Sequence, residues 1–173
     1  MRRKRLSILL MLMLAGCAGT APRPPATWHA PDTKAALQDL LCRLDDECRW
    51  LKFRLYDTDQ PLAEVRYGFE IVLSRGMLER TVDEDERAFL LAHELAHLRL
   101  KHAPPRSAEE RLPLELAADA WAAARLAQGG FDPSAGERLL LRLRDEIEAM
   151  EPQPPRAAEA LEEYARRIAA MPE

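Results

Sequence analysis

The sequence of 173 residues predicts an α+β fold that is mostly helical, with a small antiparallel sheet in its first half. Residues 50–57 alternate apolar and polar side chains, a pattern typical of a half-buried strand. Residues 62–67 and 69–74 read as two further short strands, with Gly68 as the bend between them. Later segments repeat apolar side chains every three to four residues, which indicates amphipathic helices. The length suits one domain with a sizeable core.

The N-terminus is organised like a secretory signal, with a basic start and an apolar run too short to span a membrane. The run ends in Leu-Ala-Gly-Cys17, which resembles a bacterial lipobox and implies cleavage before a lipidated Cys17. An ordinary signal with a chance cysteine is the alternative. We therefore predict a lipoprotein signal peptide over 1–16, the lipidated Cys and a flexible Pro-rich tether over 17–32, and a compact domain over 33–173.

A lipid on Cys17 would make the membrane one partner of the chain. Ala18 follows Cys17 where an Asp would indicate inner-membrane retention. Lipoprotein sorting rules then point to the periplasmic face of the outer membrane. The chain has 29 acidic against 25 basic residues, and four of the basic ones lie in the signal, so we expect no nucleic-acid partner.

Cys42 and Cys48 remain after Cys17 is assigned to lipidation. An exported compartment permits a disulfide between them. If one helix carried both, a spacing of six would place them on different faces, so a turn must intervene. The sequence leaves this pairing open.

Helix boundaries follow from caps and breakers. Asp32 or Thr33 can cap the first helix, and Thr81 with Glu84 fits a capping box for the second. We expect a polar loop over 103–112 and place Pro113 in the first turn of the next helix. The expected helices are 33–44, 82–102, 113–128, 132–150 and 156–170.

The strongest chemical signal is His93-Glu94-Leu95-Ala96-His97. On a helix, His93 and His97 lie on one face, one turn apart, and can hold one metal ion. Glu94 can then face a water bound to that ion. This pattern is the signature of a zinc peptidase.

A catalytic zinc site takes three protein ligands and leaves a fourth position for water. His102 lies five residues beyond His97, whereas the metzincin pattern requires six and a helix-breaking Gly. On a continuing helix, His102 would also point away from the other two histidines. We therefore expect His102 to act either as a cation at the helix end or as a support for the ligands.

Glu115 is the better third ligand, in Glu115-Leu116-Ala117-Ala118-Asp119. Small side chains on this second helix allow it to pack closely against the first, antiparallel to it. Asp119 lies one turn after Glu115 and can accept a hydrogen bond from a ligand imidazole.

Four segments in order resemble the gluzincin metallopeptidases that include the CAAX prenyl protease and bacterial periplasmic proteases. They are residues 62–78, 85–102, 115–122 and Gly-Phe-Asp-Pro at 130–133. The resemblance implies a zincin-like metallopeptidase domain with one Zn²⁺ on His93, His97 and Glu115, and Glu94 as catalytic base. It also implies a polypeptide substrate.

Two features depart from that family. Leu62-Ala63 stands where the family often has Asn-Ala, and residues 151–156 lack the His of a His-Pro pair that precedes an Arg. We expect a zinc-dependent endopeptidase acting on envelope proteins that are misfolded or membrane-associated. The alternative is a non-catalytic zinc-binding envelope lipoprotein or chaperone-like adaptor, and a third class is a helical lipoprotein without metal.

Overall fold

The structure is a computed structural model that describes residues 7–10, 25–66 and 68–172. Cys17 and most of residues 1–24 lie outside these ranges, as does Tyr67. The signal peptide, the lipidation of Cys17 and the tether stay predictions, and residues 26–27 and 31–32 of the predicted tether belong to a strand and a helix. Within the described ranges, no helix combines the length and apolar character needed to cross a membrane.

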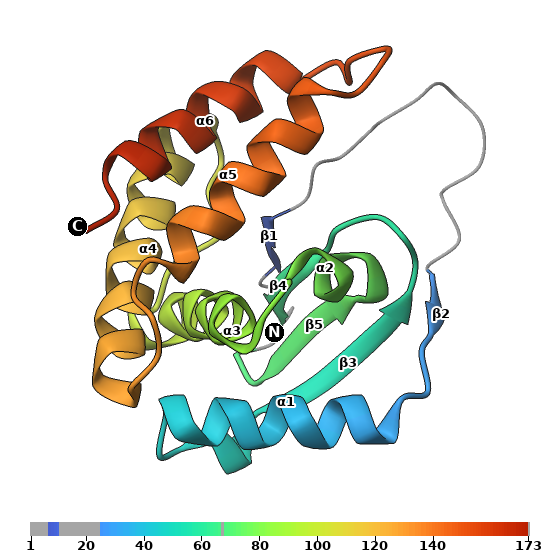
Figure 1. The fold of residues 1–173 in the computed structure, drawn as a ribbon, viewed down its shortest axis with the longest axis vertical. Coiled ribbons are helices and arrows are strands. Elements are labelled where there is room, and N and C mark those ends of the chain that lie inside the picture. The colour runs from blue at the N-terminus through green and yellow to red at the C-terminus, as the bar shows by residue number, and fades with distance from the viewer. Residues whose placement is uncertain (1–6, 11–24, 67, 173) are drawn as a thin grey trace, which may run out of the picture.

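The sheet is small, and helices lie on more than one side of it (Figure 1). Its order is β1-β4-β5-β3-β2. The strands are β1 (Ser7–Leu10), β2 (Ala26–Thr27), β3 (Lys52–Asp57), β4 (Ala63–Arg66) and β5 (Glu70–Ser74).

The prediction of an antiparallel sheet is wrong in one respect, because β3 and β5 pair in parallel. The chain leaves β3 through a turn at residues 57–62 and enters β4 in the opposite direction. A tight turn containing Gly68, with φ of 75°, then folds β5 back between β4 and β3. Glycine takes this left-handed conformation without the steric penalty that a Cβ would add. The sheet is therefore mixed.

Six α-helices and one 3₁₀ turn make up the rest of the described chain. They are α1 (Pro31–Leu44), η1 (Cys48–Trp50), α2 (Arg75–Arg80), α3 (Glu84–Arg99), α4 (Ala108–Gly129), α5 (Ala135–Glu148) and α6 (Ala157–Ala169). Helix α3 lies in the middle, in contact with α1, β4, α4 and α5 (Figure 1). Eleven of its residues are buried, so it is covered on nearly every side, as expected for a central helix.

Two predicted helix caps are wrong. Helix α1 begins at Pro31 after Ala30, because proline at the first helical position presets the backbone. Helix α3 is capped by Asp83, whose Oδ1 accepts a hydrogen bond from the Glu86 amide at 2.8 Å. The Thr81 hydroxyl instead donates to the Leu78 carbonyl at the end of α2, at 2.7 Å.

The loop predicted over 103–112 is helical from Ala108 onward. Ser107 caps α4, since its Oγ accepts a hydrogen bond from the Glu110 amide at 3.3 Å. Pro113 therefore lies inside the helix, where it removes one backbone hydrogen bond near the helix start. The predicted stop at the two glycines is confirmed, with Gly130 left-handed at φ of 76°.

Cys42 and Cys48 form a disulfide, with Cα atoms 5.0 Å apart. The turn that the spacing required is present, because α1 ends at Leu44 and η1 begins at Cys48.

We expect replacement of both cysteines by serine to lower the free energy of unfolding by about 2 kcal/mol, through the entropy of the short loop. Urea unfolding of the oxidised protein and the double variant measures this, with the reduced wild type as control. Equal stability of all three proteins would contradict it.

Gly76 permits a close approach between α2 and the turn after β3. Its amide donates to the Thr58 carbonyl at 2.9 Å, and an added Cβ would overlap the carbonyl of Asp59. Because the obstacle is backbone, we expect Gly76→Ala to lower the free energy of unfolding by about 1–3 kcal/mol. The exposed Glu79→Ala on the same helix is the control, and urea unfolding of both variants provides the comparison. A Gly76→Ala variant as stable as that control would show that the turn after β3 can shift to make room for the added Cβ.

Candidate metal centre

Two adjacent helices bring together the residues of the candidate metal centre. Helix α3 carries His93, Glu94 and His97, and α4 carries Glu115. Alanines at 118, 122 and 123 on α4 are buried, and such small side chains allow close packing of the two helices. All four functional side chains are buried, with exposed fractions of 2–3%.

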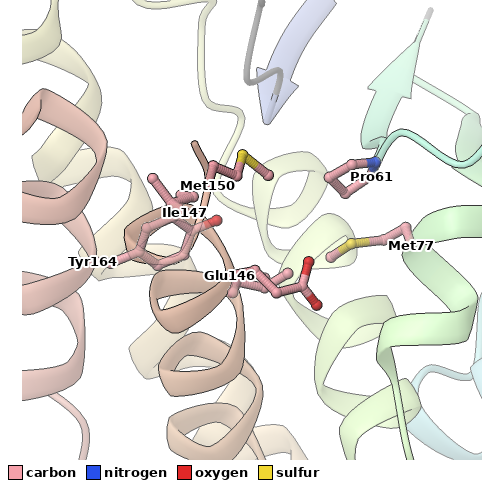
Figure 2. A pocket seen from close by; sticks show the side chains of 7 residues that line it. Pro61, Met77, Glu146, Ile147, Met150 and Tyr164 are labelled. Carbon is pink, nitrogen blue, oxygen red and sulfur yellow. The ribbon is translucent and has the colours of Figure 1, made fainter. Parts of the chain in front are cut away.

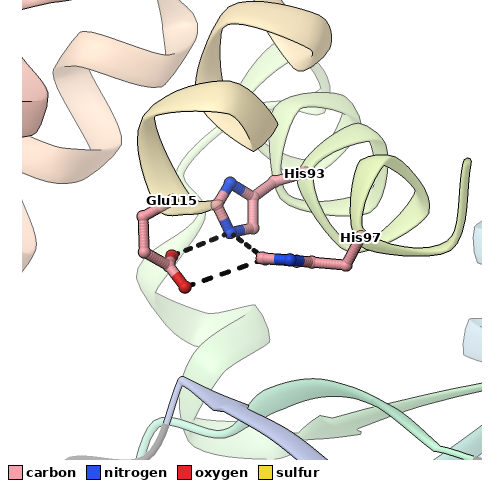
Figure 3. Close-up of side chains that lie close together, drawn as sticks. All are labelled: His93, His97 and Glu115. Atoms are coloured by element: carbon pink, nitrogen blue, oxygen red, sulfur yellow. Dashed lines mark hydrogen bonds and ion pairs between the residues drawn. The ribbon is translucent and has the colours of Figure 1, made fainter. Parts of the chain in front are cut away.

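His93, His97 and Glu115 point toward one another (Figure 3). The two Nε2 atoms lie 3.1 Å apart. His93 Nε2 is 3.3 Å from Glu115 Oε2, and His97 Nε2 is 3.8 Å from Glu115 Oε1. Two imidazoles and one carboxylate form the donor set of a hydrolytic zinc site.

The buried Glu115 Oε2 tests whether this cluster suits a cation. It makes no hydrogen bond to any described residue. A buried carboxylate oxygen without a hydrogen bond is costly unless a positive group compensates it. Arg167 Nη1, 3.2 Å away, supplies one positive charge, and the two imidazoles and the carboxylate together match the donor set of a divalent metal ion.

Two further contacts aim the imidazoles at the metal position. His93 Nδ1 lies 2.8 Å from Asp119 Oδ1, and His97 Nδ1 lies 2.9 Å from His102 Nδ1. Each contact occupies one ring nitrogen and leaves Nε2 for a metal. Asp119 thus lies where the sequence placed it.

The expectation that His102 points away from the other histidines is wrong. It assumed a helix continuing to residue 102, but α3 ends at Arg99 and Lys101 is left-handed, with φ of 55°. The chain turns back, and the His102 amide donates to the His97 carbonyl at 3.0 Å. His102 therefore contacts the ring of His97 and lies outside the three clustered donors.

Sequence reasoning missed Arg167, which reaches the centre from α6. Its Nε and Nη2 donate to Asp119 Oδ2 and Oδ1 at 2.7 and 2.8 Å. Its Nη1 lies 3.2 Å from Glu115 Oε2, without hydrogen-bond geometry. Helical spacing could have indicated it, because Arg167 shares the buried face of α6 with Ala157 and Tyr164.

Burial and charge set the protonation of the metal-free cluster. Burial raises the pKa of Glu94 to about 8. For His93, burial would lower the pKa, but the adjacent carboxylates of Asp119 and Glu115 outweigh it and raise the pKa to about 10. Burial and the positive charge on His93 lower the pKa of His97 to about 3. Despite burial, Arg167 holds the pKa of Glu115 well below its usual range. The cluster therefore stabilises charge of both signs in a buried space.

Tyr164 on α6 lines a cavity between α2, α5 and α6 (Figure 2). The cavity has a volume of about 20 Å³, enough for about one water molecule. Burial raises the pKa of the Tyr164 hydroxyl to about 12. The other walls of the cavity are mainly apolar and are formed by Pro61, Met77, Leu143, Glu146, Ile147 and Met150.

Strand β1, which pairs with β4 at the edge of the sheet, lies within the predicted signal peptide, so cleavage of that peptide would leave β4 open to an extended chain. Strand β4 contacts α3, and β1 pairs with it antiparallel, from Ser7 opposite Arg66 to Leu10 opposite Ala63. Such edge pairing supplies main-chain hydrogen bonds to any extended segment.

A helix with His93, Glu94 and His97 and a glutamate on the next helix form a donor set like that of gluzincin-type metallohydrolases. Comparison with protein families agrees, since residues 56–114 match the family model for peptidase family M48. Residues 56–114 are thus similar to peptidase family M48, and His93 and His97 of the buried His-His-Glu cluster lie within them. The matched segment is about a third of the chain and ends immediately before Glu115. No curated protein gives a match.

Proposed function

We propose that this protein is a zinc-dependent endopeptidase that cleaves polypeptides of the bacterial envelope. The observation that carries the proposal is the buried His93, His97 and Glu115 cluster beside Glu94, partly within the segment that matches peptidase family M48. Misfolded or membrane-associated proteins are the substrates we favour, because an extended chain can pair with β4 only where it is unfolded.

His93, His97 and Glu115 would hold a zinc ion, which would act as a Lewis acid toward the scissile carbonyl and lower the pKa of a water molecule. The Glu94 carboxylate takes a proton from that water and later gives it to the leaving amine. Asp119 and His102 hold the two imidazoles in the orientation that leaves each Nε2 free. Arg167 compensates the charge of the carboxylates behind them.

The proposed location is the periplasmic face of the outer membrane, through a lipid on Cys17. The Cys42–Cys48 disulfide supports an exported protein, because such bonds persist in oxidising compartments.

Labelling of cells with a radioactive fatty acid tests the lipid anchor on Cys17. Wild-type protein should carry the label and Cys17→Ala should not, and labelling of both or neither would overturn it.

The proposed activity is tested on the purified full chain by metal analysis and by cleavage of unfolded casein. We expect one zinc per chain and cleavage that a chelator abolishes and added zinc restores. Protein without zinc at these residues would overturn the proposal.

A non-catalytic zinc-binding adaptor is the second candidate. It is favoured by residues 151–156, which lack the histidine that the related peptidases carry before their arginine. An adaptor would bind one zinc and unfolded casein without cleaving it, so the same experiment separates the two.

A further inference from the structure

A groove adjoins the metal centre on the side of His97 and His102. It has a volume of about 500 Å³, within the range of about 300–1,000 Å³ usual for ligand sites. Trp50, Leu51, Phe69 and Leu98 form its apolar walls, and His97 and His102 are also part of its lining. Whatever enters the groove therefore lies next to a candidate metal ligand.

The apolar walls of the groove are unusually open to solvent. Trp50 is 80% exposed and Phe69 is 45% exposed, the first and third highest values among the exposed large apolar side chains of the described chain. Large exposed aromatic side chains at the edge of a concave site are typical of recognition surfaces. An occupant with an apolar side chain would cover both rings and bury surface that is now in water.

The charged lining of the groove disfavours a basic occupant. Glu47 and Arg99 pair with each other, with Oε2 and Nη1 2.7 Å apart. Lys101 has no ion-pair partner among the described residues and leaves positive charge at the groove. A lysine or arginine side chain would meet this charge, whereas an aromatic or long aliphatic one would meet Trp50 and Phe69.

The direction of pairing on β4 indicates which part of a substrate reaches the groove. A strand that pairs like β1 has its N-terminal end opposite Arg66. The next described residues of the chain after Arg66 are Gly68 and Phe69, which line the groove. Residues on the amino-terminal side of the cleaved bond therefore run toward it.

We propose that this groove is a specificity subsite that binds one aromatic or long aliphatic side chain of the polypeptide substrate, on the amino-terminal side of the cleaved bond, with Trp50 and Phe69 as its recognition residues. The proposal rests on the peptidase function proposed above.

The test uses zinc-loaded full chain and a peptide series in which one residue is Phe, Leu, Ser or Lys, placed in turn at each position before the cleaved bond. At one position we expect kcat/KM for Phe and Leu to exceed that for Ser and Lys by about 10-fold or more. Trp50→Ser should bring this ratio close to one. Val82→Ser is the matched control, because Val82 is 65% exposed and lies outside the groove.

A binding measurement keeps the subsite testable when cleavage is absent. The Phe peptide is added to the Glu94→Gln protein, and the tryptophan emission should shift to shorter wavelength as Trp50 is covered. The Lys peptide should give no shift, nor should the Phe peptide with a Glu94→Gln, Trp50→Ser protein.

The outcomes separate the two proposals. Cleavage with a preference that Trp50→Ser leaves intact, or equal emission shifts with Phe and Lys peptides, would overturn the subsite and leave the peptidase function standing. Emission shifts as expected with no cleavage of any peptide would show that the groove binds an apolar side chain, but would overturn the peptidase function and, with it, the role of the groove in cleavage.

Discussion

Glu94→Gln should bind zinc as the wild type does and hydrolyse peptides about 10²–10⁴-fold more slowly. The amide has nearly the same shape as the carboxylate, so the packing around α3 should be kept. It cannot take a proton from water, and Glu94 is not among the three clustered donors, His93, His97 and Glu115. Metal analysis together with kcat on a fluorogenic peptide measures both halves of this expectation.

Glu84→Gln is the matched control, because Glu84 lies in the first turn of the same helix and its side chain is 61% exposed. We expect its kcat to equal that of the wild type. A Glu94→Gln protein with full activity would assign the proton transfer to another group. A Glu94→Gln protein without zinc would instead place Glu94 among the ligands.

Arg167→Met should lower the free energy of unfolding of the metal-free protein by about 3–5 kcal/mol, because it leaves the buried carboxylates of Glu115 and Asp119 without their cation. Zinc on Glu115 supplies positive charge, so the loss should be smaller in the zinc-loaded protein. Urea unfolding of the variant and the wild type, each with zinc and with chelator, gives the four free energies of unfolding that this comparison needs.

Arg166→Met is the control for this prediction. Arg166 is the neighbouring residue, its side chain is 59% exposed, and it pairs only with Glu162 one turn earlier on the same helix among the described residues. Exposed pairs of this kind contribute about 0–1 kcal/mol. An Arg167→Met protein as stable as Arg166→Met would show that the carboxylates find compensation elsewhere.

The effect of Arg167 should also depend on pH. Despite burial, Arg167 holds the pKa of both Glu115 and Asp119 below the usual range. The stability from such carboxylates is present above their unfolded pKa and is lost as the pH falls through their folded pKa. The difference between wild type and Arg167→Met should therefore shrink in acid, and unfolding measured at neutral and acidic pH checks this.

Most elements of the fold could be predicted from local patterns. The alternation in β3 and the apolar spacing in α3 both reflect which side chains face the core. Such patterns can be read from a short stretch of sequence. Helix ends were less predictable, because Thr81 and Asp83 are both good caps. The choice depended on α2, which ends at Arg80 and takes Thr81 as its C-terminal cap. The local sequence pattern also did not predict the parallel pairing of β3 with β5, because strand order is decided by contacts between distant segments.

For the metal centre, the sequence by itself determined three donors, since helical spacing and a motif at fixed distance place His93, His97 and Glu115 on facing helices. Only the tertiary structure decided what surrounds them. Arg167 lies 48 residues beyond Asp119 and meets it because α6 packs against α4. His102 meets His97 because one left-handed residue reverses the chain. Both contacts depend on where the backbone turns and which helices pack together, and no pattern within a single helix encodes that.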